Sequence, residues 1–127
     1  MEKTIAIRWR DIDGFRHVNN SVYLTYLEEA RDALVEAFAG PLIDRFVIRR
    51  IEIDYLSQLV QDDGSVRVTC DVDGIGTTSV RTREEVHALS DGRLVARAAA
   101  VLVYMDDGRG TPEPIGGALR ERVEALA

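Results

Sequence analysis

Residues 8–24 read RWRDIDGFRHVNNSVYL and determine how the rest of the chain is interpreted. The stretch carries an acidic turn, a histidine and two asparagines, and an apolar pattern of helical period begins directly after Asn20. Free backbone N–H groups and the positive end of the helix dipole meet at a helix start, so a carbonyl oxygen that gains charge can be stabilised there. Asp13 lies a few residues upstream and can either attack such a carbonyl or take a proton from water. His17 can orient that carboxylate or the water.

The helix predicted after this stretch runs from Ser21 to Ala39. One of the preceding asparagines can cap its start, and the Gly40-Pro41 pair is a typical stop signal. Glu28 and Arg31 have the spacing of an ion pair on the helix surface. The apolar stripe, with steps of three and four residues, consists of Tyr23, Leu27, Ala30, Leu34 and Phe38.

Segments rich in Val and Ile, separated by turn sequences, predict the strands of an antiparallel sheet. In the first segment Ile5, Ile7 and Trp9 alternate onto one face, and the last segment is apolar on both faces, as in a central strand. The apolar parity switches across Arg49 and Arg50, which predicts a bulge. The strands are long enough that the sheet is expected to curve around the single long helix, an α+β fold. The predicted strands cover residues 4–10, 46–57, 65–75, 78–90 and 94–105, and a short helix covers 118–126.

The composition restricts the class of protein. Of 127 residues, 46% are apolar and 30% charged, which is typical of one globular domain spanning residues 1–127. The formal net charge of −6 provides no overall positive field for nucleic acid or an anionic membrane, so neither is an expected partner. No apolar stretch approaches the roughly 20 residues that cross a bilayer. A single cysteine, Cys70, and an N-terminus without a secretory signal pattern point to the cytoplasm.

The order D-x-D-x-x-x-H-V-N-N, followed by Tyr-Leu and Glu-Ala-Arg, resembles the signature of hot-dog-fold acyl-CoA thioesterases of the 4-hydroxybenzoyl-CoA thioesterase type. The resemblance runs from Arg8 through Arg31 and continues more loosely to Leu119. It implies a hot-dog fold, in which a curved antiparallel sheet of about five strands wraps one long helix. It also implies a homodimer or homotetramer whose subunits pair sheets edge to edge, with each active site at the dimer interface.

The implied reaction is hydrolysis of an acyl-CoA or acyl-carrier-protein thioester to a free acid and a thiol. Coenzyme A takes part only as a portion of the substrate, and no other cofactor is implied. The resemblance makes Asp13 the nucleophile or general base, the backbone N–H of Asn20 the oxyanion donor, and His17 a positioning residue. The substrate-binding residues that it implies are Thr78 and Ser79. From the residues alone, Tyr23 in the first helical turn can contact substrate, and Arg81 can meet the coenzyme A phosphates. A core position for Tyr23 and a solvated strand face for Arg81 are the favoured interpretations.

Two residues depart from the pattern: Arg16 stands where many relatives carry glycine, and Gln58 where they carry proline. Arg16 can obstruct entry to the site, which leaves a second hypothesis, a non-catalytic protein that binds acyl thioesters. A dehydratase of the same fold is a third hypothesis, although no hydratase motif is present. His87 has no Cys or second His at ligand spacing, so no metal site is expected. Cys70 alternates with valines and is expected in the core.

Overall fold

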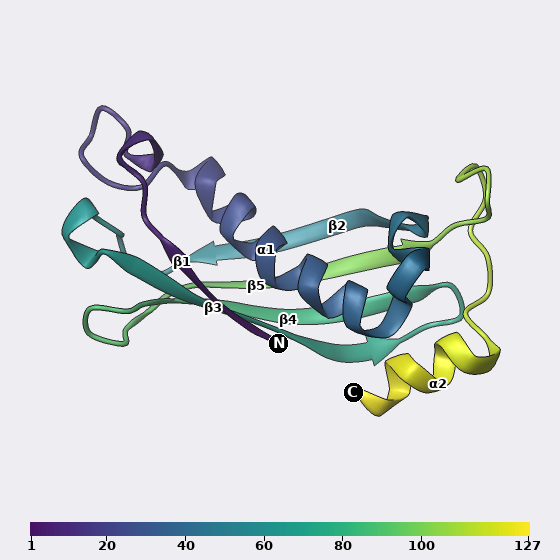
Figure 1. The fold of residues 1–127 in the computed structure, drawn as a ribbon. Helices are drawn as coiled ribbons and strands as arrows, with labels where there is room; N and C mark the ends of the chain where they lie inside the picture. The colour runs from purple at the N-terminus through teal and green to yellow at the C-terminus, as the bar shows by residue number, and fades with distance from the viewer.

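In the computed structural model, which describes residues 1–127, one long helix lies across one face of a curved five-stranded antiparallel sheet (Figure 1). The strand order is β1-β3-β4-β5-β2, so β1 and β2 form the two edges. This is the arrangement that the sequence and its resemblance predict. The elements are β1 (Glu2–Ala6), η1 (Trp9–Asp11), α1 (Asn20–Ala39), η2 (Gly40–Arg45), β2 (Phe46–Tyr55), η3 (Gln61–Asp63), β3 (Ser65–Ile75), β4 (Ser79–Ala88), β5 (Leu94–Tyr104) and α2 (Gly117–Ala125).

The core lies between α1 and the concave face of the sheet. Every residue of the predicted stripe on α1 is at most 3% exposed, and the stripe packs against alternate residues of the central strands. Those strand residues are Val66, Val68, Cys70, Val80 and Val86, all fully buried. Each large apolar side chain buried in this way contributes on the order of 1.5–3 kcal/mol to folding. The core positions of α1 and of Cys70 are therefore confirmed.

Both ends of α1 are fixed by the residues that the sequence singles out. The side chain of Asn19 accepts hydrogen bonds from the backbone N–H and the hydroxyl of Ser21, each at 2.9 Å, and so caps the first turn. Gly40 ends the helix with φ of 54°, a left-handed backbone conformation that favours glycine. The N-cap is thus Asn19, which leaves Asn20 as the first residue of the helix.

The first strand is shorter than predicted, and its proposed apolar face is wrong at Trp9. Pairing with β3 ends at Ala6, after which the chain turns through η1 and leaves Trp9 86% exposed. The cause is Asp11, whose carboxylate accepts hydrogen bonds from the backbone and the guanidinium of Arg8 and closes a tight turn. Ile7 alone follows the alternation into the core.

Two further expectations are corrected. Arg31 does not form a surface pair with Glu28. It is 3% exposed, and its guanidinium donates two hydrogen bonds to the carboxylate of Glu84 on β4, at 2.8 and 2.7 Å. The middle of β5 is buried on one face only, because no helix covers the convex side of the sheet, where Arg97 and Ala99 are exposed. The predicted bulge is confirmed, since the register of β2 against β5 shifts between Ile48 and Arg50.

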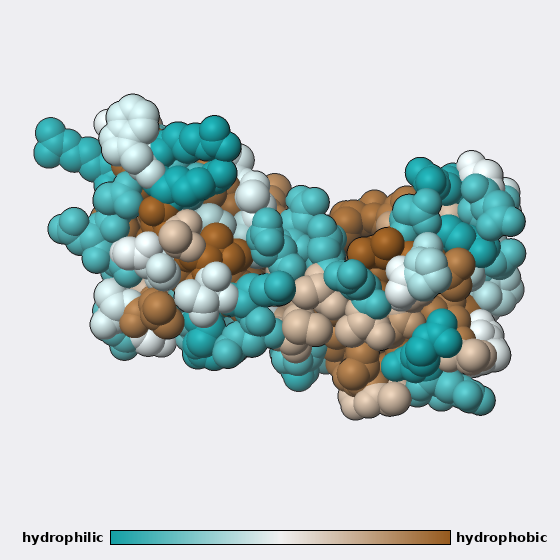
Figure 2. All heavy atoms as spheres, viewed as in Figure 1, coloured by the Kyte–Doolittle hydropathy of each residue, from teal (hydrophilic) through white to brown (hydrophobic).

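The surface that remains is mixed. On the face shown in Figure 2, hydrophobic side chains are visible in two areas separated by hydrophilic ones. The edge strand β2 adds exposed apolar residues, with Val47 37% and Ile48 44% exposed. None of the helices is both long and apolar enough to cross a membrane.

Candidate functional site

The loop between η1 and α1 is a closed turn. Ile12 and Val18 form an isolated antiparallel bridge across its base, and the backbone N–H of Asp13 donates to the carbonyl of His17 at 3.0 Å. The N–H of Arg16 donates to the carbonyl of Asp13 at 3.1 Å. Val18 is 1% exposed and anchors the loop in the core. Asp13 and His17 are therefore held side by side on a well-defined turn directly before the helix.

Asp13 presents a carboxylate of which one oxygen is bound locally. Its Oδ1 accepts the backbone N–H of Phe15 at 2.8 Å, and its Oδ2 lies 3.6 Å from Nδ1 of His17. The side chain is 19% exposed, so solvent or a ligand can reach it. An oriented, reachable carboxylate suits either attack on a carbonyl or removal of a proton from water.

His17 is positioned by several contacts. Its Nδ1 lies 3.3 Å from the carbonyl oxygen of Val18 and 3.6 Å from Asp13, and its ring stacks on Phe15 with centroids 6.2 Å apart. Both neighbours of Nδ1 are acceptors, so the neutral ring favours the tautomer with the proton on Nδ1. This tautomer leaves Nε2 free to accept a hydrogen bond. The geometry agrees with a positioning role.

A cavity of about 410 Å³ opens beside these residues, and its lining includes His17, Asn20, Tyr23, Tyr55, Ser57 and Gln58. The backbone N–H of Asn20 donates to no group of the chain. It is one of the free donors at the start of α1, where the helix dipole is positive. The cavity thus combines an unused backbone donor with a neighbouring carboxylate.

Tyrosines form the wall of this cavity next to the helix. Tyr23 is 3% exposed and packs edge to face on Tyr55, with ring centroids 5.1 Å apart. The hydroxyl of Tyr55 donates to the carbonyl of Asn20 at 3.0 Å. Tyr23 is therefore both a core residue and part of the cavity wall. This position is compatible with core packing and with contact to a substrate. Sequence reasoning did not single out Tyr55 as a site residue, although it lies in the looser part of the family match.

Asp11 is a buried residue that stabilises the segment before α1, and the sequence analysis did not single it out. It is 1% exposed, its carboxylate accepts the hydroxyl of Tyr26 at 2.7 Å as well as the Arg8 donors, and its backbone carbonyl accepts the N–H of Asn19. Burial alone would raise the pKa of Asp11, but the hydrogen bonds from Arg8 and Tyr26 outweigh it and hold the pKa below its usual value. Asp11 is therefore a buried carboxylate that ties η1 to α1.

Arg93, at the start of β5, holds the opposite wall of the cavity. Its guanidinium donates to the carbonyl of Gln58 at 2.6 Å and to the hydroxyl of Ser57 at 3.1 Å, and it pairs with Asp63 at 3.0 Å. The hydrogen bonds from Arg93 lower the pKa of the Asp63 carboxyl well below its usual value, against the effect of burial. No sequence signal pointed to Arg93, because its partners Ser57, Gln58 and Asp63 lie 30 to 36 residues earlier in the chain.

The remaining predicted residues lie elsewhere in the chain. Ser79 opens β4 opposite Val103, which pairs with Val47 near the start of β2, whereas Asn20 contacts Tyr55 at its end. At about 3.3 Å per residue, Val47 and Tyr55 are roughly 25 Å apart along β2. Thr78 adjoins Ser79, and its carbonyl accepts the backbone N–H of Tyr104. A single chain therefore does not bring Thr78 and Ser79 to Asp13.

Arg81 lies on the exposed face of β4, and its guanidinium covers Gly74 on β3, where a Cβ would come within 2.1 Å of it. This is the convex face of the sheet, so Arg81 is also separate from Asp13 in one chain. His87 has a buried Nδ1 without a partner. No group of three or more His, Cys, Asp or Glu side chains is placed to hold a metal ion.

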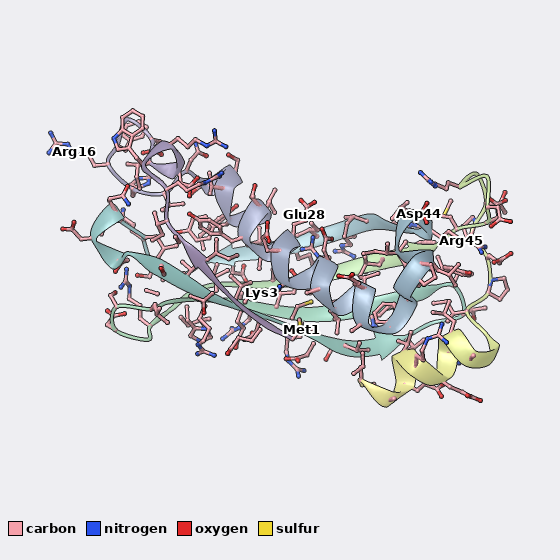
Figure 3. All side chains as sticks on the ribbon, viewed as in Figure 1. Met1, Lys3, Arg16, Glu28, Asp44 and Arg45 are labelled. Carbon is pink, nitrogen blue, oxygen red and sulfur yellow. The ribbon has the colours of Figure 1, made fainter.

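Arg16 sits at the tip of the loop with φ of 67°, where a glycine would be relaxed. Figure 3 shows its side chain extending outward, away from the body of the molecule. In this orientation Arg16 does not cover the cavity, so the expected obstruction of the site is absent.

A second cavity, of about 330 Å³, lies between α1 and β2. Seven of its ten lining residues are apolar, and Leu24, one helical turn beyond Asn20, is among them. Arg31 and Asp32 line it as well, and burial together with the nearby Glu28 raises the pKa of Asp32. The cavity is thus a mainly apolar groove between α1 and β2, separate from the first cavity, with which it shares no lining residue.

Comparisons with known proteins identify the family and the fold of the chain. The sequence model of the thioesterase-like superfamily matches residues 7–123. A thioesterase from Thermus thermophilus, solved in complex with coenzyme A and Zn, is 34% identical with a TM-score of 0.88, over 98% of this chain and 92% of that chain. A predicted thioesterase from Bacillus stearothermophilus is 30% identical with a TM-score of 0.90, over 100% and 96% of the two chains. The long-chain acyl-CoA thioesterase FadM of Escherichia coli K12 is 28% identical over 99% of this chain and 98% of its own length. The fold shared with these structures confirms the expected hot-dog arrangement.

Proposed function

Because the chain belongs to the thioesterase-like superfamily and is a thioester hydrolase, we propose that it hydrolyses acyl-CoA thioesters, with Asp13 as the catalytic carboxylate and the N–H of Asn20 as the oxyanion donor. The observation that carries this proposal is the free backbone donor of Asn20 on the same cavity as His17, whose neighbour is the carboxylate of Asp13. The similarity to proteins named acyl-CoA thioesterase, one of them solved with coenzyme A, supports the substrate class.

Two routes lead from this geometry to the same products. As a general base, Asp13 takes a proton from water while the water oxygen attacks the thioester carbonyl. The carbonyl oxygen becomes negative and accepts the N–H of Asn20, the C–S bond breaks, and the thiolate takes up the proton. As a nucleophile, Asp13 instead displaces the thiolate and forms a mixed anhydride, which water then cleaves to the free acid.

The test is release of free thiol from a panel of short, long and aromatic acyl-CoAs and an acyl-carrier protein. We expect Asp13→Asn to lower turnover by about 10²-fold or more, since loss of a positioned base removes that much rate, while thermal unfolding stays unchanged. Single turnover in ¹⁸O-labelled water separates the routes, because only the anhydride route can place label in Asp13. Equal turnover by wild type and variant would exclude Asp13 as the catalytic carboxylate. Tight binding without turnover by either would favour the non-catalytic alternative.

The acyl group is assigned to the groove between α1 and β2. This cavity starts at Leu24, on the same side of α1 as Asn20, and its apolar residues come from both elements. An alkyl or aryl group whose carbonyl rests at Asn20 can extend into it and leave water, which is the usual driving force for apolar ligands. Leu24→Trp should narrow the groove and shift the preference of the enzyme to shorter acyl groups.

The functional unit is proposed to be a dimer formed by two β2 edges. The first half of β2 carries Arg49 and Arg50, and the second half carries Glu52 and Asp54. When β2 pairs antiparallel with a second copy of itself, each arginine pair lies opposite the carboxylates of the other copy. Unpaired backbone groups and exposed apolar residues on this edge support the same arrangement.

This pairing also offers a role for Thr78 and Ser79, which lie far from Asp13 within one chain. The start of β2 in one copy lies next to the end of β2 in the other. The end at Tyr55 adjoins the site. The start pairs with the end of β5, which in turn pairs with the start of β4 at Ser79, next to Thr78. The second copy therefore carries its Thr78 and Ser79 toward the site of the first, where they can meet the pantetheine arm. A tetramer would be two such dimers.

A further inference from the structure

The two most exposed aromatic side chains of the molecule lie in η1 and in the loop that leads to α1. Trp9 is 86% exposed and Phe15 is 83% exposed, whereas no other large apolar residue exceeds 51%. Both belong to the turn-and-loop segment that carries Asp13. Large apolar side chains presented this fully mark an interaction surface far more often than isolated, partly covered ones.

Two unpaired arginines accompany these rings. Arg10 and Arg16 form no ion pair in the chain, whereas Arg8 forms an ion pair with the buried Asp11. The protein as a whole carries a net charge of −6, so these two free guanidinium groups provide local positive charge on an acidic molecule. We refer to Trp9, Arg10, Phe15 and Arg16 together as the arginine–aromatic loop. Free guanidinium groups beside aromatic rings suit a ligand that has both phosphates and a flat ring.

The arginine–aromatic loop is held rigidly next to the site. The carbonyl of Asp11 accepts the N–H of Asn19 at 2.9 Å, and the bridge from Ile12 to Val18 closes the loop at its base. The ring of Phe15 stacks on His17, which lines the site cavity. Figure 3 shows Arg16 at the outer tip, so the segment extends from the cavity mouth into solvent. A ligand whose reactive end lies at Asp13 can therefore run outward along this segment.

We propose that the arginine–aromatic loop binds the 3′-phosphoadenosine diphosphate portion of coenzyme A, with adenine against Trp9 and phosphates on Arg10 and Arg16. The inference rests on the proposed function, because it takes the substrate to be a coenzyme A thioester. Stacking on an indole ring provides area without base-specific contacts, and charge-assisted hydrogen bonds hold the phosphates. This position differs from Arg81 on the convex sheet face, the phosphate ligand expected from sequence.

The first test uses Trp9 as the reporter, since it is the only tryptophan in the chain. Titration of the wild-type protein with free coenzyme A should quench or shift its fluorescence. Pantetheine, which has the same thiol arm but no nucleotide, should produce no such change, and 3′,5′-ADP should reproduce part of it. Absence of a change with coenzyme A, or an equal change with pantetheine, would overturn the proposal.

The second test compares two substrates with the same acyl group. In the double variant Arg10→Gln/Arg16→Asn, the KM for the acyl-CoA should rise by about tenfold, as expected for loss of two charge-assisted contacts, with kcat nearly unchanged. Hydrolysis of the acyl-N-acetylcysteamine thioester, which lacks the nucleotide, should stay the same. Asn is chosen at position 16 because it tolerates the left-handed backbone. Arg97→Gln, an exposed arginine without an ion pair on the convex face, is the matched control.

The outcomes separate this inference from the proposed function. If Arg81→Gln raises the KM for acyl-CoA and the double variant does not, the phosphates bind on the sheet and the arginine–aromatic loop does not hold them. If the double variant weakens both substrates equally, the loop acts on the reaction and not on the nucleotide, and the inference fails. In either case loss of turnover in Asp13→Asn would still uphold the thioesterase mechanism. Coenzyme A quenching in a protein that hydrolyses no thioester would uphold the loop as a nucleotide site alone.

Discussion

Asp11 and Asp13 are two residues apart and have different environments, which set different roles. Asp11 is buried, and both of its carboxylate oxygens accept hydrogen bonds from Arg8 or Tyr26. Asp13 is partly exposed, and its Oδ2 lies 3.6 Å from Nδ1 of His17, which is longer than a normal hydrogen bond. A carboxylate whose hydrogen bonds are complete stabilises the fold, whereas one with a reachable oxygen is available for chemistry.

Asp11→Asn should lower the free energy of unfolding at pH 7 by about 2–3 kcal/mol, the usual loss for a hydrogen-bonded charged group. The folded-state pKa of Asp11 lies below its ordinary value. Its contribution to stability is therefore complete above the unfolded pKa of about 3.9 and is lost as the pH falls through the folded pKa. Urea titrations of both proteins from pH 7 to pH 3 should show the difference shrinking below about pH 4. A constant difference would contradict the role given to Asp11, and Asp62→Asn, at an exposed position, is the control.

The neighbouring asparagines give a second contrast at the residue scale. The side chain of Asn19 caps α1, whereas the side chain of Asn20 makes no hydrogen bond and only its backbone N–H is assigned to the oxyanion. Asn19→Ala should lower stability by about 1 kcal/mol. Asn20→Ala should keep kcat within about threefold, since the backbone donor persists. A loss of kcat in Asn20→Ala comparable with that of Asp13→Asn would show that the side chain, and not the backbone, stabilises the oxyanion.

At the scale of elements, Arg93 connects the start of β5 to η3 and to the segment that follows β2. Its hydrogen bonds to Ser57, Gln58 and Asp63 hold one wall of the site cavity in place. Asp63 is 8% exposed at its side chain and Arg93 is 31% exposed, so the pair is screened less than a surface ion pair. The contacts of Arg93 therefore position the wall together with the backbone N–H groups of Leu56 and Ser57, which donate to the carbonyl of Val95 on β5.

Arg93→Gln and Asp63→Asn should each reduce the free energy of unfolding by about 2 kcal/mol, and the double variant by about 1–2 kcal/mol less than the sum. Chemical denaturation of the four proteins of this cycle gives the coupling. Arg93→Gln should also raise KM more than it lowers kcat, since the cavity wall loosens while Asp13 stays in place. Strictly additive losses would show that the two residues act independently. Arg97→Gln, at an exposed position on β5, is the control.

The elements differ in how well the sequence predicts them. The long helix is predictable because its apolar period and its end signals depend on nearby residues only. Trp9 breaks the strand alternation because the carboxylate of Asp11 draws the chain into a turn, a side-chain effect that a period of two does not describe. Arg31 and Arg93 are unpredictable for another reason, since their partners Glu84 and Asp63 are brought near only by the tertiary fold. Within the site, the motif locates Asp13, His17 and Asn20, and the cavity walls depend on long-range contacts.

At the scale of the whole molecule, the fold is an open sheet with one face covered by a helix and a long uncovered edge. The edge strand β2 is ten residues long, whereas the other edge, β1, has five. Long uncovered edges pair readily with another strand, and natural proteins restrict such pairing by charge. In β2 the charges are ordered so that they repel a parallel copy and attract an antiparallel one.

The last prediction tests this dimer directly. Arg49→Glu/Arg50→Glu makes β2 wholly acidic at its charged positions, and Glu52→Arg/Asp54→Arg makes it wholly basic, so each variant alone should be monomeric in sedimentation velocity. Like charges opposite one another are destabilising in a strand pair, and opposite charges are favourable. An equimolar mixture of the two should therefore recover the dimer and with it the hydrolysis of acyl-CoA, because each site needs the second copy. Lys3→Glu, on the other edge strand, should leave the oligomeric state unchanged. Full activity in a monomeric variant would show that one chain completes the site without a partner.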